Sequence, residues 1–136
     1  MSVDDGLRVL FRKNIPRCHW QSVETGFTSR GVPDSNFCLD GFEGWVEFKS
    51  VRRGWIVPLR PEQIAWLITR EKHGGRTFVA VRRRTEGADE LWIFRGKYAR
   101  ELRDYGLRHP QELLTTAGGP SRWDWEKVRY ALQQYD

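Results

Sequence analysis

The sequence predicts a single α/β domain in which helices flank a central mixed β-sheet. An amphipathic helical segment comes first, three strand-like segments follow it, and a second helical segment separates these strands from two more. Helices and strands in this order bury their apolar faces most readily as a sheet covered by helices. The length of 136 residues suits one domain with a hydrophobic core of its own.

The first half of the chain supplies one helix and three strands. Apolar residues at helical spacing predict a helix over residues 3–13. A first strand is expected over residues 19–23. Residues 35–39 and 45–51 predict two further strands, and residues 40–44, with an Asp-Gly pair at their start, predict the turn that joins them into a hairpin.

The second half continues with a helix that follows Pro61. Proline suits the first position of a helix, and the glycine pair at residues 74–75 suits its end. Further elements are expected as two strands and two helices, over residues 77–81, 91–94, 97–105 and 125–134. No repeat or linker divides the sequence, so a core at about residues 19–95 is expected to carry a helical extension over residues 96–136.

The composition favours a polyanionic partner inside a cell. The net charge is +5, and basic side chains that neutralise phosphates gain free energy from the release of counterions. No apolar run reaches the roughly 20 residues that a transmembrane helix needs, so no membrane partner is expected. The acidic start without an apolar stretch does not suit a signal peptide, which predicts an intracellular protein.

Two carboxylates and a lysine form the candidate reaction site. Glu47 and Lys49 lie two apart in a predicted strand, so their side chains project from one face while Phe48 faces the core. If the hairpin forms, Asp34 enters beside this strand. Paired carboxylates suit Mg²⁺ or Mn²⁺, with the Phe48 carbonyl as a third ligand. Lys49 would position or deprotonate a metal-bound water, or offset charge in the transition state.

The spacing of Glu47 and Lys49 also has a structural explanation. A salt-bridged strand on the surface shows the same triplet, and for the triplet alone this is the better explanation. The apolar neighbours Trp45, Val46 and Val51 favour a buried strand instead. A buried glutamate and a buried lysine are costly unless they are paired or bound to a metal.

Three motifs together resemble the PD-(D/E)xK nuclease superfamily. They are Gly-Val-Pro-Asp at residues 31–34, Val-Glu-Phe-Lys at residues 46–49 and Leu-Arg-Pro-Glu-Gln-Ile-Ala-Trp at residues 59–66. The resemblance spans about residues 19–82, and the closest branch is the VRR-NUC type, which is common in phages and related to archaeal-type Holliday junction resolvases. It implies a restriction-endonuclease-like core.

The resemblance implies roles for four residues. Asp34 and Glu47 match the metal ligands, and Lys49 matches the catalytic lysine. Gln63 matches a glutamine that this branch places on the helix after the lysine strand, where its amide would hold a metal-bound water or a phosphate oxygen. An ordinary residue in the first turn of a helix explains Gln63 equally well.

Residues in the loop before Gly31 are further candidates. Glu24 is a candidate metal ligand, because members of the superfamily often carry an extra acidic residue upstream of the Pro-Asp pair. An ion pair between Glu24 and Arg30 is the alternative. Ser29 and Arg30 are candidate contacts to DNA phosphates, and plain loop polarity is the alternative for Ser29.

Basic clusters and one tryptophan are expected to supply the other DNA contacts, at Arg52, Arg53, Arg82, Arg83, Arg84 and Trp55. The alternative for each cluster is a solvated strand end. Trp55 would stack on a splayed base or lie buried at a dimer interface. The interface is favoured, because related resolvases act as two-fold dimers that match a four-way junction.

These features together predict a Mg²⁺-dependent, structure-specific DNA endonuclease of phage or prophage origin, which would act in the host cytoplasm. Branched DNA is the expected substrate, with a homodimer that resolves Holliday junctions as the leading interpretation. A flap or nicking nuclease on the same site is one alternative, and a DNA-binding accessory protein that does not cut is another. No organic cofactor is expected.

Overall fold

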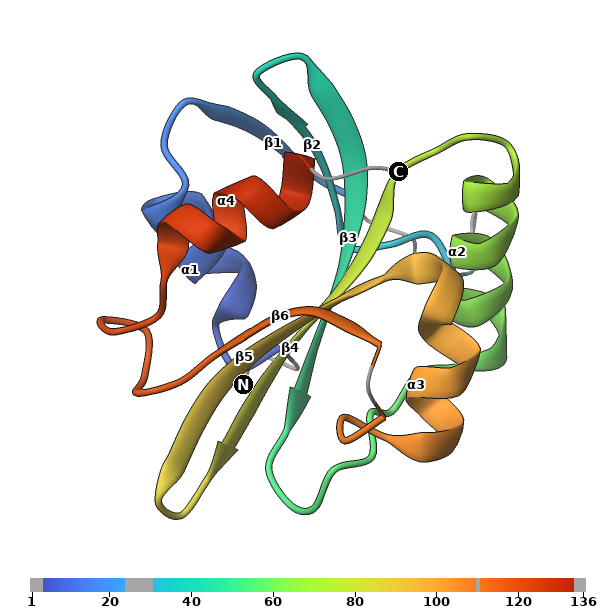
Figure 1. The fold of residues 1–136 in the computed structure, drawn as a ribbon. Coiled ribbons are helices and arrows are strands. Elements are labelled where there is room, and N and C mark those ends of the chain that lie inside the picture. The colour runs from blue at the N-terminus through green and yellow to red at the C-terminus, as the bar shows by residue number, and fades with distance from the viewer. Residues whose placement is uncertain (1–3, 24–30, 110, 134–136) are drawn as a thin grey trace.

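A computed structural model describes residues 4–23, 31–109 and 111–133. In this part of the chain one six-stranded sheet, in the order β1-β2-β3-β4-β5-β6, is flanked by four α-helices (Figure 1). The elements are α1 (Leu7–Asn14), β1 (Cys18–Ser22), β2 (Ser35–Leu39), β3 (Phe42–Val51), α2 (Pro61–Lys72), β4 (Thr77–Thr85), β5 (Ala88–Arg95), the 3₁₀ helix η1 (Gly96–Tyr98), α3 (Ala99–Tyr105), β6 (Glu112–Thr116) and α4 (Trp125–Gln133). Among the described helices, none combines the length and apolar character that crossing a bilayer requires.

The sheet is mixed, which confirms the predicted α/β class. β2 and β3 form an antiparallel hairpin, and the two residues between them, Asp40 and Gly41, have φ angles of 50° and 86°. Positive φ at both central residues is what a type I′ turn requires, and Asp-Gly is among the pairs that adopt it most readily. The chain then crosses one face of the sheet through α2, so that β4 runs parallel to β3.

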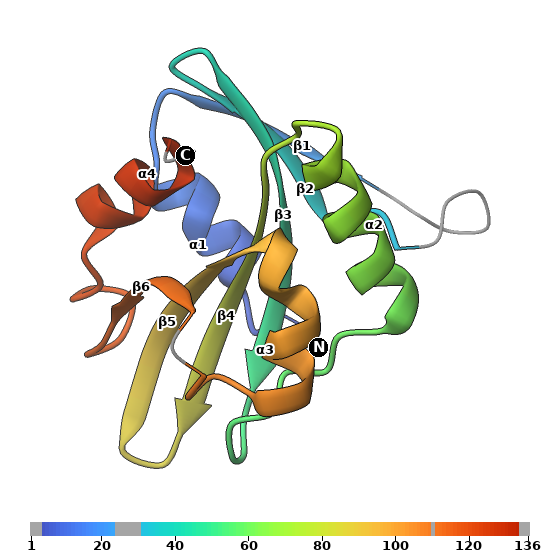
Figure 2. The ribbon, with the colours of Figure 1, turned by 45° about the vertical axis from the view of Figure 1, so that its right-hand side comes forward.

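Two hydrophobic cores lie on opposite faces of the sheet. α1 and α4 cover one face, where Phe48 is buried, and α2 and α3 cover the other, where Ile64 is buried (Figures 1 and 2). Side chains of β3 alternate between the two faces. Glu47 and Lys49 therefore lie on the α2 face, opposite Phe48, as the sequence predicts.

The first helix is shorter than predicted. α1 begins at Leu7 rather than near residue 3, because Asp5 and Gly6 adopt left-handed backbone conformations with φ of 54° and 77°. A right-handed helix does not continue through residues in this region. Residues 1–3 lie outside the described residues.

The predicted helical extension over residues 96–136 also contains a strand. Glu112–Thr116 forms β6, which pairs with β5 at the edge of the sheet. Its burial alternates, with Leu113 exposed and Leu114 partly buried. So short a segment carries little apolar signal in the sequence, and its conformation depends on the neighbouring strand.

Candidate active site

Glu47 is the buried centre of the candidate site. Its side chain is 3% exposed and lies between β3 and the first turn of α2. One carboxylate oxygen, Oε2, accepts a hydrogen bond from Nε2 of Gln63 at 2.9 Å and lies 3.5 Å from Nζ of Lys49. The other oxygen, Oε1, is also buried and accepts no hydrogen bond from an N–H or O–H group of the described residues, and the carboxyl group of Asp34 lies within hydrogen-bond reach of the Glu47 carboxyl group. A buried carboxylate oxygen without a donor is costly unless a cation or a water meets it.

Asp34 reaches the same place from the loop before β2. Its Oδ2 accepts a hydrogen bond from the backbone N–H of Phe48 at 3.0 Å, and its carbonyl accepts one from Val23 at 2.9 Å. Gly31 lies tightly against α2, since a Cβ there would stand 2.2 Å from the carbonyl oxygen of Glu62. The Pro-Asp motif is therefore positioned by the end of β1 on one side and the start of α2 on the other.

The Phe48 carbonyl lies on the same edge of β3 as Asp34. The pairing between β2 and β3 ends at Ser35 and Val46, so Phe48 lies beyond it. The N–H and C=O groups of one strand residue point to the same edge, and the N–H of Phe48 points to Asp34. The carbonyl that the sequence suggested as a third metal ligand is thus on the side where a metal at Asp34 would need it.

Burial disfavours charge on both carboxylates, and repulsion from Asp34 adds to this effect at Glu47. Burial and then the negative charge of Asp34 raise the pKa of Glu47 to about 8, while Lys49 opposes the shift. The pKa of Asp34 is also raised by burial, and the N–H of Phe48 and the charge of Lys49 oppose this. The pair therefore tends to retain a proton near neutral pH, and a divalent cation bound there would displace it.

The described residues fit a hard divalent cation that has few protein ligands. Asp34 and Glu47 offer carboxylate oxygens, and Phe48 offers a carbonyl. Within residues 4–23, 31–109 and 111–133, no group of three or more His, Cys, Asp or Glu side chains is placed to hold a metal. Mg²⁺ commonly binds through one or two carboxylates and keeps several waters. Oε1 of Glu47, which accepts no hydrogen bond from the described residues, is available to such an ion.

Gln63 is engaged at both ends of its amide. Its Oε1 accepts a hydrogen bond from the backbone N–H of Arg60 at 3.0 Å, and its Nε2 donates to Glu47. Because the Arg60 N–H can only donate, the oxygen end must face it and the NH₂ end must face Glu47. In this arrangement Gln63 caps the first turn of α2 and holds Glu47, and its predicted contact with a metal-bound water or a phosphate stays a prediction.

Asp4 contributes to the site, although the sequence analysis did not single it out. Its negative charge helps to raise the pKa of Asp34. Its carboxylate also caps the start of α1, where it accepts hydrogen bonds from the N–H groups of Gly6 at 3.0 Å and Arg8 at 3.3 Å. An aspartate just before a helix is a capping signal that sequence alone can reveal. Its closeness to Asp34 depends on how α1 packs against the sheet.

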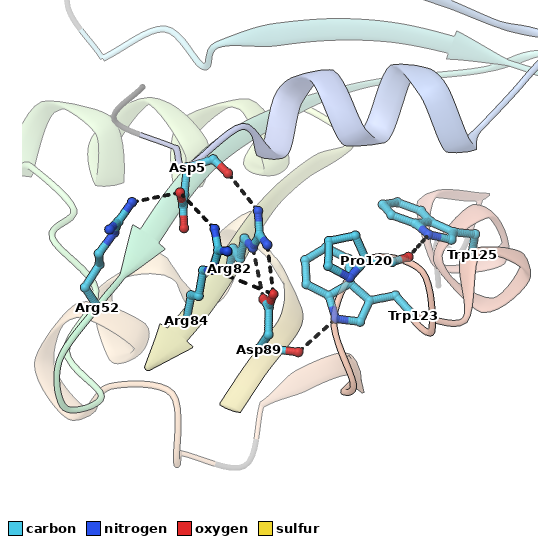
Figure 3. Close-up of polar contacts among 8 residues, drawn as sticks. All are labelled: Asp5, Arg52, Arg82, Arg84, Asp89, Pro120, Trp123 and Trp125. Carbon is cyan, nitrogen blue, oxygen red and sulfur yellow. Dashed lines mark hydrogen bonds and ion pairs between the residues drawn. The ribbon is translucent and has the colours of Figure 1, made fainter. Parts of the chain in front are cut away.

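Arg82, Arg52 and Arg84 take part in an ion-pair network (Figure 3). Arg82, whose side chain is 8% exposed, donates hydrogen bonds to both carboxylate oxygens of Asp89, at 2.9 and 2.8 Å, and a third to the carbonyl of Asp5. Arg52 and Arg84 lie 2.8 and 3.7 Å from the Asp5 carboxylate and are more than half exposed. Arg82 therefore joins the N-terminal turn to the sheet, whereas Arg52 and Arg84 stay accessible to a polyanion.

Trp55 and Arg83 pack together beside β5. The guanidinium carbon of Arg83 lies 3.5 Å from the centre of the Trp55 ring, and that of Arg108 lies 4.6 Å from it. Trp55 also packs edge to face against Trp92. Much of the Trp55 ring is thus covered within the chain, while Arg53 is exposed at the end of β3.

The other predicted contacts lie outside the described residues. Glu24, Ser29 and Arg30 all belong to residues 24–30, which the structure does not describe. Their roles as metal ligand and DNA contacts stay predictions.

No protein-family model matches the chain, and no curated protein matches it either. The likeness to PD-(D/E)xK nucleases therefore rests on the three sequence motifs and on the meeting of Asp34, Glu47 and Lys49.

Proposed function

We propose that the protein is a metal-dependent nuclease that hydrolyses phosphodiester bonds in DNA. The observation that carries the proposal is the meeting of Asp34 with Glu47 and Lys49, which come from a different segment of the chain. An acidic pair beside a lysine can hold a divalent cation and still stabilise the negative charge of phosphoryl transfer.

Some of these residues would bind the ion, and others would stabilise negative charge during the reaction. Asp34, Glu47 and the Phe48 carbonyl would bind the ion. The ion, when bound, polarises a phosphoryl oxygen and lowers the pKa of a bound water. Lys49 holds its ammonium group beside Glu47, where it can orient the attacking water or offset charge on the phosphoryl oxygens. Gln63 keeps the Glu47 carboxylate in place.

Branched DNA is the proposed substrate. The net charge of +5 and the exposed Arg52 and Arg84 suit a polyanion. The crossover from β3 to β4 through α2 is compatible with a restriction-endonuclease-like core. The resemblance to VRR-NUC nucleases points to a four-way junction cut by a homodimer or to a flap cut at one site. Paired cuts in a junction require two sites in one symmetrical assembly.

Cleavage of a panel of labelled DNAs tests the proposal. The panel holds a four-way junction, a flap, a splayed arm, a linear duplex and a single strand, each incubated with Mg²⁺, Mn²⁺ or EDTA. Wild type is compared with Glu47→Gln and with Glu86→Gln, which neutralises an exposed glutamate in the β4–β5 turn. Metal-dependent cutting that only Glu47→Gln abolishes is the expected result.

The pattern of cutting then decides the substrate. Paired symmetrical cuts in the junction would identify a resolvase, whereas cuts confined to flaps or splayed arms would identify a flap-type nuclease. Tight binding without cutting of any DNA would contradict the nuclease and indicate a DNA-binding accessory protein.

A further inference from the structure

A groove lies beside α2 on the face of the sheet that also carries Glu47. Two adjoining cavities of about 590 and 500 Å³ form it, and Arg70 lines both. Trp66 of α2 lines the first cavity, while Trp45, Gln21 and Asn36 of the neighbouring strands line the second. α2 and the end of the sheet with β1, β2 and β3 can be followed in Figure 2. These five residues define what we call the Trp45–Arg70 groove.

Arg70 is held against two tryptophans in this groove. Its guanidinium carbon lies 4.6 Å from the ring centre of Trp66 and 5.5 Å from that of Trp45. The two rings meet edge to face with their centres 5.2 Å apart. The stem of Arg70 packs on Gly75, where a Cβ would lie 2.5 Å from its Cγ. The Arg70 side chain is nonetheless exposed, and no carboxylate among the described residues pairs with it.

A guanidinium packed on indole rings offers two kinds of contact to a nucleic acid. Its plane and the accessible parts of the rings can stack on a base, and its N–H donors can bind a phosphate. The faces of bases in a duplex are covered by their neighbours, so stacking selects unpaired nucleotides. Arg70 and Arg76 line the groove together with Glu43 and Glu62, and Glu62 lies 3.5 Å from Arg60. The groove thus offers the Arg70 guanidinium as a donor to a phosphate.

The groove adjoins the candidate metal site. Trp45 and Glu47 lie two residues apart on one face of β3, which puts their Cα atoms about 7 Å apart. Val23, which lines the groove, donates its N–H to the carbonyl of Asp34 at 2.9 Å. A nucleotide seated on Arg70 and Trp45 would therefore neighbour a phosphate held at Asp34 and Glu47.

We propose that the Trp45–Arg70 groove binds an unpaired strand of DNA next to the scissile phosphate. The inference rests on the nuclease function proposed above and narrows its substrate class to branched DNA with a single-stranded arm, such as a flap or a splayed arm. The groove offers side-chain amides, the rings of two tryptophans and an exposed arginine, which suit the bases and phosphates of an unpaired strand.

Binding of labelled DNA in EDTA, where no cutting occurs, tests the groove. The probes are a fluorescent oligothymidylate and a blunt duplex of the same length, measured by anisotropy. Trp66→Ala is expected to weaken single-strand binding about tenfold, and Arg70→Gln several-fold, with duplex binding unchanged. Arg100→Gln, which removes the same charge from the exposed surface of α3, is the matched control. Trp66→Phe should retain most of the binding, because it keeps an aromatic face.

Equal losses for single strand and duplex, or no loss for the single strand, would overturn the proposal. Thermal melting checks the fold of Trp66→Ala, and Arg70→Gln keeps the test valid if that variant unfolds, because Arg70 is exposed. If the wild type cuts DNA and the groove variants bind single strands as well as the wild type does, the groove proposal is wrong and the nuclease proposal stands. If the groove variants lose single-strand binding but the wild type cuts no DNA, the groove proposal stands and the nuclease proposal is wrong.

Discussion

Gln63 donates a hydrogen bond from Nε2 to Oε2 of Glu47 at 2.9 Å, which ties the first turn of α2 to β3. The side chains are 5% and 3% exposed. The bond holds one oxygen of the Glu47 carboxylate in place, while Oε1 accepts no hydrogen bond from an N–H or O–H group of the described residues. The pair therefore combines a structural contact with a carboxylate oxygen that can serve as a ligand, and variants of each member separate these two roles.

Gln63→Leu should lower the free energy of unfolding by about 1–3 kcal/mol, because Glu47 and the Arg60 N–H each lose a buried hydrogen-bond partner. Urea denaturation without metal measures the change. Gln133→Leu is the control, since its amide bonds to Asp40 on the exposed surface, and its cost is expected to stay within about 0.5 kcal/mol. Equal costs for the two variants would show that the Gln63–Glu47 bond adds nothing.

Asp34→Asn should reduce metal-dependent cleavage by about 100-fold or more, since loss of groups that merely orient metal ligands already costs about 10- to 100-fold. The fold should survive, because the asparagine oxygen can still accept the hydrogen bond from Phe48. Initial rates in Mg²⁺ and thermal melting measure the two effects. Asp104→Asn, at an exposed aspartate beside Arg103, should leave both unchanged. A fully active Asp34→Asn variant would remove Asp34 from the metal site.

The stability of the metal-free protein should fall as the pH rises from about 5 to about 8.5. The pKa of Glu47 is about 8 in the folded protein, above its ordinary value of 4.5, so the folded state keeps a proton that the unfolded chain releases. This proton stabilises the folded state fully below the pKa of Glu47 in the unfolded chain. The stabilisation is lost as the pH rises through the pKa of Glu47 in the folded protein. A tenfold difference in proton affinity between the folded and unfolded states corresponds to about 1.4 kcal/mol.

Urea denaturation in EDTA at both ends of this pH range, with wild type and Glu47→Gln, measures the effect. The variant should lose less stability, because its amide does not titrate. Burial raises the pKa of Asp34 in both proteins and shifts their stability in the same direction. Identical pH dependence in the two proteins would mean that Glu47 ionises normally.

Arg82→Ala should destabilise the fold by about 3 kcal/mol, because it strips a largely buried partner from Asp89 and a donor from the Asp5 carbonyl. Arg84→Ala, at a side chain that is 53% exposed, should cost less than about 1 kcal/mol. Urea denaturation compares the two. If Arg84→Ala cost as much as Arg82→Ala, the network would not depend on the buried arginine.

The salt dependence of DNA binding should respond to Arg52 and Arg84. Neutralising both with glutamine should reduce the magnitude of the slope of log affinity against log salt concentration by about 1–2. Each phosphate contact that is lost means about one fewer counterion released when DNA binds. Anisotropy titrations over a range of salt concentrations measure the slope. Arg129→Gln, whose side chain is 22% exposed and bonds to Asp40, is the control. An unchanged slope in the double variant would make Arg52 and Arg84 ordinary surface residues.

Local chemistry made much of the fold predictable. The Asp-Gly pair at residues 40–41 adopts the positive φ angles that a tight hairpin requires. Pro61 begins α2, as proline at the first helical position favours. β6 and the late start of α1 were not predicted. The strand depends on pairing with β5, and the helix start depends on left-handed conformations at Asp5 and Gly6.

Part of the candidate site was likewise predictable from local sequence, and part depended on the tertiary structure. The two-residue period of a strand was enough to place Glu47 and Lys49 on one face, opposite Phe48, whereas their selection as site residues also needed the neighbouring sequence motifs. Only the tertiary structure decided that Gln63 faces Glu47 instead of solvent, and that Arg82 turns inward to Asp89. Strand periodicity is a local property of the backbone that a sequence displays directly. The partner of a buried polar side chain depends on how distant segments pack, because burial makes every unpaired donor or acceptor costly.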